Sequence, residues 1–225
     1  MLTEELKKIE SLQVRKFVET ALNNADPKFW EAPASSSGKY HPYEDLGKGG
    51  LIRHIKKGIL VIEQCARRAV FSEYESDLAM GAFLLHDIRK NGNVWGEKTD
   101  YTHGIIGSEW LKQFKMDDPS GKQMILYAVR YHMAPWCWVV PPFENRLYTQ
   151  KEMKDNLAEL TRALVSPGRI ELAVREGDYW SSRRSMSFLP EKSIVYDPRL
   201  HDSPKEWLNS LKDVSDKISN IETKN

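Results

Sequence analysis

Apolar residues recur at intervals of three and four along most of the chain, which is the spacing of amphipathic α-helices. The first such stretch covers residues 2–22 and is expected to stop near Asn23 and Pro27. Residues 31–50, which are rich in Pro, Ser and Gly, then predict a loop. Short extended runs occur only at residues 136–140 and 193–196, so the pattern predicts an all-α fold.

Five further helices are expected after this loop, and they cover residues 51–70, 76–87, 102–114, 119–132 and 166–178. Ser76 or Asp77 is expected to cap the second of these helices, and Thr102 the third. Pro119 suits the first position of the fourth, where a missing N–H costs nothing. The helices therefore alternate with short polar loops, as in a helical bundle.

No internal repeat or long linker divides the chain, so we expect one core with extensions. Residues 1–30 form an N-terminal helical segment, residues 31–185 the main domain, and residues 186–225 a C-terminal extension. An amphipathic helix is predicted in this extension from Trp207, Leu208, Leu211, Val214 and Ile218. This helix is expected to pack on the core. Alternatively, it packs on a second subunit, so a homodimer is also possible.

Composition restricts the classes of protein that need to be considered. The 225 residues carry 33 Lys and Arg against 32 Asp and Glu, a formal net charge of +1, so long nucleic acids are not expected partners. Two cysteines cannot build a disulfide framework, and the chain begins without the apolar stretch of a signal peptide. No apolar run approaches the roughly 20 residues of a membrane span. We therefore expect a soluble cytoplasmic protein with no membrane partner.

The placement of histidines is the strongest chemical signal in the chain. Four of the six histidines fall at the start or end of a different expected helix: His54, His86, His103 and His132. Asp87 follows His86 directly. Helix ends that meet in a bundle core are a place where a metal site can be assembled from facing elements.

Six residues in a fixed order resemble the pattern of the HD-domain metal-dependent phosphohydrolases: His54 in GGLIRHIKKG, His86 and Asp87 in AFLLHDIRKNG, His103 in YTHGIIGSEW, His132 in YAVRYHMAPW and Asp178 in VREGDYW. The resemblance spans roughly residues 33–184 and implies a single HD-domain helical bundle. It implies that the first His, the HD pair and the final Asp hold one metal ion. It further implies that the two intermediate histidines hold a second ion, bridged by Asp87.

Two narrower resemblances suggest different substrates. His103 before Gly and His132 after Tyr look like the bacterial HD-type diadenosine tetraphosphate hydrolases. The stretch PASSSGKYHP, followed by GGLIRH, is similar to the segment that precedes the first metal histidine in HD domains of 3′-to-5′ exoribonucleases and some conjugative relaxases. Because the two resemblances point to different substrates, they do not together select one.

The residue types themselves favour particular metals. Imidazole and carboxylate together suit Mn, Fe, Co or Ni, with Zn and Mg as alternatives. One Asp and several His leave coordination positions free for water and substrate, as in catalytic sites. Two ions about 3.5–4 Å apart would suit an in-line displacement at phosphorus. We therefore expect a divalent transition metal cofactor, with two ions.

Several alternatives remain open at this point. The histidines can instead cap helices or line the edge of the core without binding a metal. Glu176 competes with Asp178 for the role of last ligand. His103 and His132 can contact the substrate around a single ion rather than bind a second one.

Other polar and aromatic residues near the motif are candidates for the reaction. Asp87 and Lys90 are expected to act in catalysis, with Lys90 as a point charge on phosphate. Arg89 replaces the glycine of the family's HD-I-G-K pattern, so the turn after the HD pair is expected to differ. The candidate substrate-binding residues are Lys39, Tyr40, His41, Arg89, Trp136 and Arg183. For each of them the alternative is a side chain that packs in the protein or is exposed to solvent without binding substrate.

These observations favour a metal-dependent phosphohydrolase or phosphodiesterase that cleaves a phosphoester or phosphoanhydride of a nucleotide or small oligonucleotide. One alternative is a non-catalytic HD scaffold that binds a nucleotide or regulates a partner. Another is a nuclease that acts on longer RNA or DNA, which the net charge of +1 disfavours.

Overall fold

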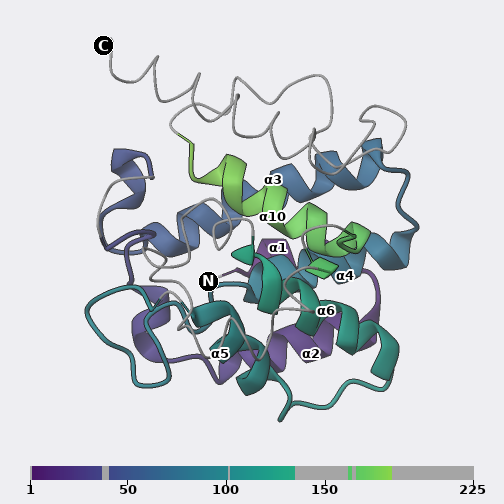
Figure 1. Cartoon of the computed structure of the whole chain (residues 1–225), viewed down its shortest axis with the longest axis horizontal. Helices are drawn as coiled ribbons and strands as arrows, with labels where there is room; N and C mark the ends of the chain where they lie inside the picture. The colour runs from purple at the N-terminus through teal and green to yellow at the C-terminus, as the bar shows by residue number, and fades with distance from the viewer. Residues whose placement is uncertain (1, 37–40, 101, 135–161, 164–165, 184–225) are drawn as a thin grey trace.

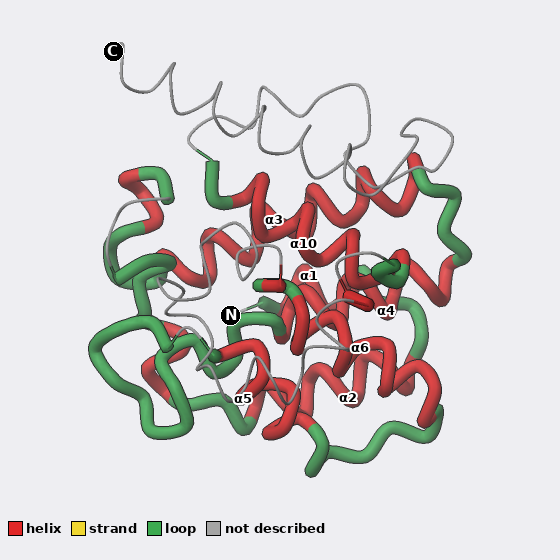
Figure 2. Tube along the Cα trace, viewed as in Figure 1, coloured by secondary structure: helices red, strands yellow, loops and turns green. Residues whose placement is uncertain are grey.

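The described part of the chain consists of helices and loops without a strand (Figure 2). The computed structural model describes residues 2–36, 41–100, 102–134, 162–163 and 166–183. The all-α prediction is confirmed for these residues, whereas the two short extended runs, residues 136–140 and 193–196, lie outside them. Among the described helices, none is both long enough and apolar enough to cross a membrane.

The helices occur in the following order: α1 (Thr3–Lys7), α2 (Leu12–Asn23), η1 (Pro27–Trp30), η2 (Tyr43–Asp45), α3 (Gly50–Arg68), α4 (Glu73–Leu85), α5 (His103–Leu111), α6 (Pro119–Tyr131) and α10 (Arg169–Ser181). The α2 helix ends at the expected place, and α3 and α6 lie close to their expected positions. The two η elements are short 3-10 helices. The loop expected at residues 31–50 therefore contains one short helical turn.

The expected single helix at residues 2–22 is wrong, because the chain breaks into α1 and α2. The Asp77 carboxylate, which comes from α4, accepts hydrogen bonds from the backbone N–H groups of Glu10 (3.0 Å) and Ser11 (2.7 Å). It thereby binds the start of α2. Ile9 is fully buried at the break. The chain thus makes a contact with a distant helix at the point where a continuous helix was expected. Local periodicity cannot predict such a contact.

Asp77 is consequently not the cap of α4, and neither is Ser76. Ser72 caps this helix, since its hydroxyl accepts from the Glu75 N–H while the Glu75 side chain accepts from the Ser72 N–H. This reciprocal arrangement is a capping box. The helix therefore begins one turn earlier than expected, and it ends at Leu85, directly before His86.

The α4 helix lies in the middle of the bundle and packs against α2, α3, α6 and α10. Its fully buried Phe83 ring occupies the junction with α3 and α10. A Cβ added at Gly58 of α3 or at Gly177 of α10 would lie only 2.0 Å or 2.7 Å from this ring. The two glycines therefore allow three helices to approach one another beside His86, whose ring stacks on Phe83.

The α3 and α10 helices lie side by side and run antiparallel (Figure 1). At one end of the pair, Arg169 donates to the carbonyl groups of Ala69 and Val70. At the other end, Ser181 lies beside His54. The start of α3 and the end of α10 are thus brought together with the end of α4.

The N-terminal helices share the core of the rest of the described chain. The residues of α1, α2 and the intervening turn that join this core are Leu2, Ile9, Val14, Phe17, Val18, Ala21 and Leu22. Residues 1–30 thus pack as part of the bundle. The C-terminal extension, residues 186–225, lies outside the described residues.

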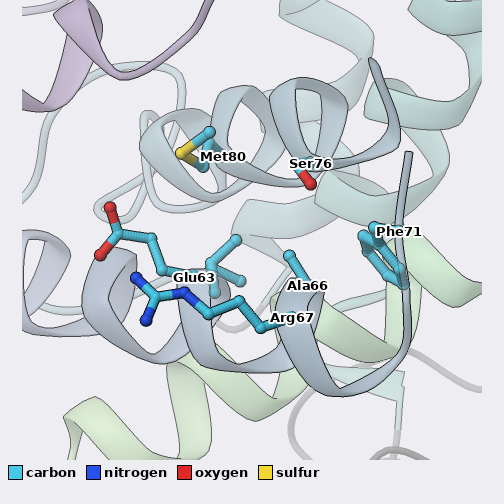
Figure 3. Close-up of a pocket in the computed structure, with 7 residues that line it drawn as sticks. Glu63, Ala66, Arg67, Phe71, Ser76 and Met80 are labelled. Carbon is cyan, nitrogen blue, oxygen red and sulfur yellow. The ribbon is translucent and has the colours of Figure 1, made fainter. Parts of the chain in front are cut away.

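A hollow of about 230 Å³ lies between α3 and α4 (Figure 3). Ile62, Ala66, Phe71 and Met80 form its apolar lining, and Arg67 and Ser76 add polar groups. The remaining lining residue, Glu63, is paired with Lys8 at 2.7 Å. The hollow lies toward the end of α3 and the start of α4, away from His54 and His86.

Candidate metal centre

Four histidines and two aspartates from five helices gather at one place in the bundle. His54 lies in the second turn of α3, His86 and His132 immediately follow α4 and α6, and His103 is the first residue of α5. Asp87 follows His86, and Asp178 lies in the last turns of α10. The histidine side chains and that of Asp87 are almost completely buried, whereas 18% of the Asp178 side chain is exposed. All six expected metal ligands are therefore close neighbours.

His54, His86 and Asp178 form one part of the cluster, which we call the three-helix half because it joins α3, α10 and the end of α4. The Nε2 atom of His54 lies 3.2 Å from Asp178 Oδ1 and 3.4 Å from His86 Nε2. His86 Nε2 lies 3.7 Å from the same Asp178 oxygen. Three potential ligand atoms thus face one small volume.

His103 and His132 form the other part, which we call the two-helix half because it joins α5 and α6. Their Nε2 atoms are 3.0 Å apart. A Cβ added at Gly104 would lie 2.8 Å from the carbonyl oxygen of Val129. The glycine that follows His103 is therefore needed for α5 to approach the end of α6 so closely.

Asp87 lies between the two halves, and each of its carboxylate oxygens faces one of them. Its Oδ2 is 3.4 Å from His86 Nε2, and its Oδ1 is 2.9 Å from His103 Nε2 and 3.9 Å from His132 Nε2. Ligand atoms lie within 4.8 Å of one another in three overlapping groups: His54, His86 and Asp87; His86, His132 and Asp178; and Asp87, His103 and His132. Asp87, His86 and His132 each belong to two of these groups, and Asp87 has one oxygen near His86 and the other near His103, as a bridging ligand would.

The four rings share one orientation, with Nδ1 bound to a neighbouring oxygen and Nε2 turned toward the centre. Three Nδ1 atoms approach the carbonyl oxygen three residues earlier: His86 to Phe83 (2.6 Å), His103 to Asp100 (2.6 Å) and His132 to Val129 (2.7 Å). His54 Nδ1 approaches the Ser181 hydroxyl at 3.0 Å. A carbonyl oxygen only accepts, so Nδ1 carries the proton in those three rings, and in its neutral form each ring keeps a lone pair on Nε2.

This arrangement leaves acceptors facing acceptors. Asp87 Oδ1 is buried without a hydrogen-bond partner, although His103 Nε2 is only 2.9 Å away. With the His103 ring neutral and its proton on Nδ1, both atoms present lone pairs to the same space, which is unfavourable unless a metal ion or a second ring proton lies between them. Metal-bound histidines typically donate their other ring N–H to a carbonyl in this way. The buried cluster of His and Asp side chains can thus hold a metal ion.

The two aspartates are held in the ionised form by their neighbours. Burial raises the pKa of Asp87, but Lys90 and His86 lower it by more, so the pKa lies well below its usual range. Burial likewise raises the pKa of Asp178, and His54 and His86 lower it well below the usual range. Both side chains are therefore carboxylates at neutral pH, the form in which they bind metal.

The histidines divide according to the charges near them. Burial, together with the charge of nearby His103, lowers the pKa of His132 to about 3. Burial also lowers the pKa of His86, but Asp87 and Asp178 raise it above its usual value overall. The His132 ring therefore stays neutral. The His86 ring attracts a proton when no other cation balances the carboxylates of Asp87 and Asp178.

Lys90 is a further part of this centre. Its side chain is buried, and its Nζ lies 2.5 Å from Asp87 Oδ2. The backbone N–H of Lys90 binds the Asp87 carbonyl oxygen at 2.9 Å, which forms a tight turn directly after the HD pair. Lys90 thus places a positive charge next to the expected bridging carboxylate.

His41 is the one residue of the expected substrate-binding loop that the structure describes. Its ring centroid lies 4.9 Å from that of His54, and its buried Nδ1 atom has no hydrogen-bond partner. Burial, followed by the charges of His54 and Lys90, lowers the pKa of His41 to about 2. A neutral ring with an unused nitrogen therefore lies beside the cluster.

The remaining candidates are placed differently. Arg89 stacks on Trp110 with 4.3 Å between its Cζ and the ring centroid, and it donates to the Asn93 carbonyl. Arg183 stacks on Tyr179 at 4.0 Å, one residue beyond Asp178. Neither contacts a metal ligand through its side chain among the described residues. Lys39, Tyr40 and Trp136 lie outside the described part of the chain.

Glu176 and Asp178, the two alternatives for the last ligand, have different surroundings. The Glu176 carboxyl is buried away from the histidines and accepts a hydrogen bond from Trp180 Nε1 at 2.9 Å. Burial raises its pKa to about 8. Asp178 faces His54 and His86 instead.

Sequence reasoning did not identify Ser181, which touches His54 from the next turn of α10. A serine three residues after Asp178 has no local signal that separates it from any other helical serine.

No protein-family model, curated protein or solved structure matches this chain.

Proposed function

We propose that the chain is a metal-dependent phosphohydrolase that cleaves a phosphoester or phosphoanhydride bond of a nucleotide or small oligonucleotide. The observation that carries this proposal is the convergence of four histidine Nε2 atoms on the carboxylates of Asp87 and Asp178. The order of the ligands along the chain, which resembles that of HD-domain phosphohydrolases, supplies the reaction class.

We assign two divalent ions to the centre, one in each half, with Asp87 between them. The imidazole and carboxylate donors favour Mn, Fe, Co or Ni, with Zn or Mg as alternatives. When bound, such ions polarise phosphoryl oxygens and lower the pKa of coordinated water. The orphaned Asp87 Oδ1, which faces the His103 and His132 nitrogens, supports a cation in the two-helix half.

The side chains of the protein itself have three further tasks in this proposal. Lys90 neutralises charge on the phosphate from its position beside Asp87. His41 offers its free ring nitrogen to a polar group of the substrate next to His54. The partial exposure of Asp178, where the other ligands are almost completely buried, marks the side from which a small substrate enters.

The decisive experiment combines metal analysis with hydrolysis. The purified protein is stripped of metal, reloaded with Mn²⁺, Fe²⁺, Co²⁺ or Ni²⁺, and assayed against mononucleotides, dinucleoside polyphosphates and short RNAs. We expect bound metal and turnover of at least one of these substrates, and loss of turnover in a folded Asp87→Asn variant. A protein that binds metal but hydrolyses none of them would contradict the proposal.

The same assay separates the two alternatives. A non-catalytic scaffold would bind a nucleotide without turnover, and its affinity would be unchanged by Asp87→Asn. A nuclease on long RNA or DNA would show affinity that falls steeply with salt, because many phosphate contacts release counterions. A small-substrate enzyme would show little salt dependence.

A further inference from the structure

The four metal-site rings are oriented by oxygen atoms of two different kinds. His86, His103 and His132 each use the backbone carbonyl oxygen three residues earlier. These contacts are local, because each ring lies at a helix end or in a first turn and reaches a carbonyl oxygen of its own segment. His54 is the exception, because its Nδ1 partner is a side-chain hydroxyl from another helix, Ser181, 127 residues away.

The position of His54 explains why it needs a distant partner. The residue lies within α3, which begins at Gly50, and the backbone carbonyl groups inside an α-helix are engaged by N–H groups four residues later. The other three rings lie at helix boundaries, where the carbonyl three residues earlier is within reach of the side chain. An acceptor for His54 Nδ1 must therefore come from a neighbouring helix, and α10 provides it.

The hydrogen bonds of Ser181 define the direction of its contact with His54. Its Oγ lies 2.6 Å from the Gly177 carbonyl oxygen, to which only the hydroxyl can donate. The single hydroxyl proton is thereby used, so Oγ accepts from His54 Nδ1–H. The Ser181 side chain is fully buried, and water is therefore not available as a substitute.

We propose that Ser181 is a positioning residue of the metal centre, which fixes His54 in the tautomer that presents an Nε2 lone pair to the metal. This inference rests on the metal centre of the proposed function. In this role the hydroxyl of Ser181 does for His54 what a backbone carbonyl does for each of the other three rings. Losing it leaves a buried Nδ1–H without an acceptor, or lets the proton move to Nε2, and both outcomes weaken metal binding.

The chain offers a matched control in the adjacent residue. Ser182 is also buried near the end of α10, and its hydroxyl also donates to a carbonyl of the preceding turn, that of Tyr179 at 2.8 Å. No metal-ligand side chain contacts its hydroxyl among the described residues. Ser181→Ala and Ser182→Ala therefore remove the same group and the same type of backbone hydrogen bond, and they differ in the contact with His54.

The experiment measures Zn²⁺ and Mn²⁺ affinity by chelator competition for the full chain and both variants. We expect Ser181→Ala to bind metal about 10–100-fold more weakly, the usual effect of losing such a partner, and Ser182→Ala to match the wild type. Equal affinities for both variants and the wild type would overturn the role of Ser181 alone. A wild-type chain that binds neither ion would overturn the metal centre and the proposed function with it.

A second measurement needs no variant and so does not depend on Ser181→Ala folding. Long-range ¹H–¹⁵N spectra of the Zn²⁺-loaded wild type report which ring nitrogen of His54 carries the proton. We expect Nδ1–H with Nε2 bound to the ion. A His54 ring that binds Zn²⁺ through Nδ1 would contradict the assignment.

Discussion

The two halves of the candidate metal centre are built in different ways. In the three-helix half, His54 depends on α10 for both Asp178 and Ser181, which are more than 100 residues away in the sequence. In the two-helix half, His103 and His132 are each held by a carbonyl three residues earlier, and Gly104 lets their helices meet. Ring orientation is thus a property of tertiary packing in one half and of local geometry in the other.

This difference has a consequence for how the halves respond to change. Substitution of Ser181, whose hydroxyl contacts His54, is expected to disturb that ring while leaving the two-helix half intact. A change at Gly104 is expected to separate His103 from His132, because a Cβ would meet the α6 backbone. Asp87 is the element that the two halves share.

Replacing Asp87 with Asn affects both halves and has the largest expected effect. The neutral amide keeps the shape of the side chain but removes the charge that both sets of ligands face. We expect metal content to fall to background and hydrolysis to fall by more than ~100-fold, beyond the loss that removing one outer partner causes. Elemental analysis, hydrolysis and circular dichroism of the same preparation test this.

Asp45→Asn is the control for that variant. Asp45 is equally buried and is paired with Lys57 at 2.8 Å, but it is not one of the metal ligands. Its amide variant should retain full metal content. An Asp87→Asn protein that keeps its metal would show that Asp87 does not bridge the halves.

Single substitutions in each half test whether the halves hold one ion or two. We expect His54→Asn and His103→Asn each to reduce the metal content from two ions to one, because each removes a ligand from a different half. Titration with Mn²⁺ measures the stoichiometry. If His103→Asn keeps the wild-type ion count while hydrolysis falls, His103 contacts substrate around a single ion instead.

Lys90→Gln is expected to reduce hydrolysis without removing metal. Its ammonium lies 2.5 Å from Asp87 Oδ2 and is placed to stabilise charge on the reacting phosphate. Loss of one such electrostatic contact costs about 10²–10³-fold in turnover. The control is Lys57→Gln, which breaks a comparable pair with a buried aspartate outside the centre. Equal turnover of both variants and the wild type would exclude Lys90 from the reaction.

The residues that the sequence identified are those whose role is visible in local pattern. Histidines at helix boundaries, the HD pair and an aspartate near the end of an apolar helix all belong to the observed cluster. Pro119 marked the start of α6 correctly, whereas the expected caps of α4 and α5 were wrong, because Ser72 caps α4 and Thr102 makes no capping hydrogen bond. His41, the histidine that precedes His54 in the sequence, also lies beside the cluster.

The features that the sequence missed depend on contacts between distant residues. Ser181 acts on a ring 127 residues away, and nothing in its neighbourhood distinguishes it from Ser182. The stacking of Arg89, a candidate for substrate binding, on Trp110 of α5 was also not predicted. The break between α1 and α2 was missed because the Asp77 carboxylate that causes it comes from another helix.

Asp77 provides the last and smallest test of the centre, since it is a buried aspartate of α4 that belongs to neither half. Its carboxylate binds the N–H groups of Glu10 and Ser11, so Asp77→Ala leaves two backbone donors at the start of α2 without their acceptor. We expect the free energy of unfolding to fall by about 1–3 kcal/mol, the cost of unsatisfied buried donors, with metal content unchanged. Urea unfolding and metal analysis measure the two quantities. Metal loss at unchanged stability would instead show that the start of α2 is coupled to the centre through α4, although Asp77 is not a member of the ligand cluster.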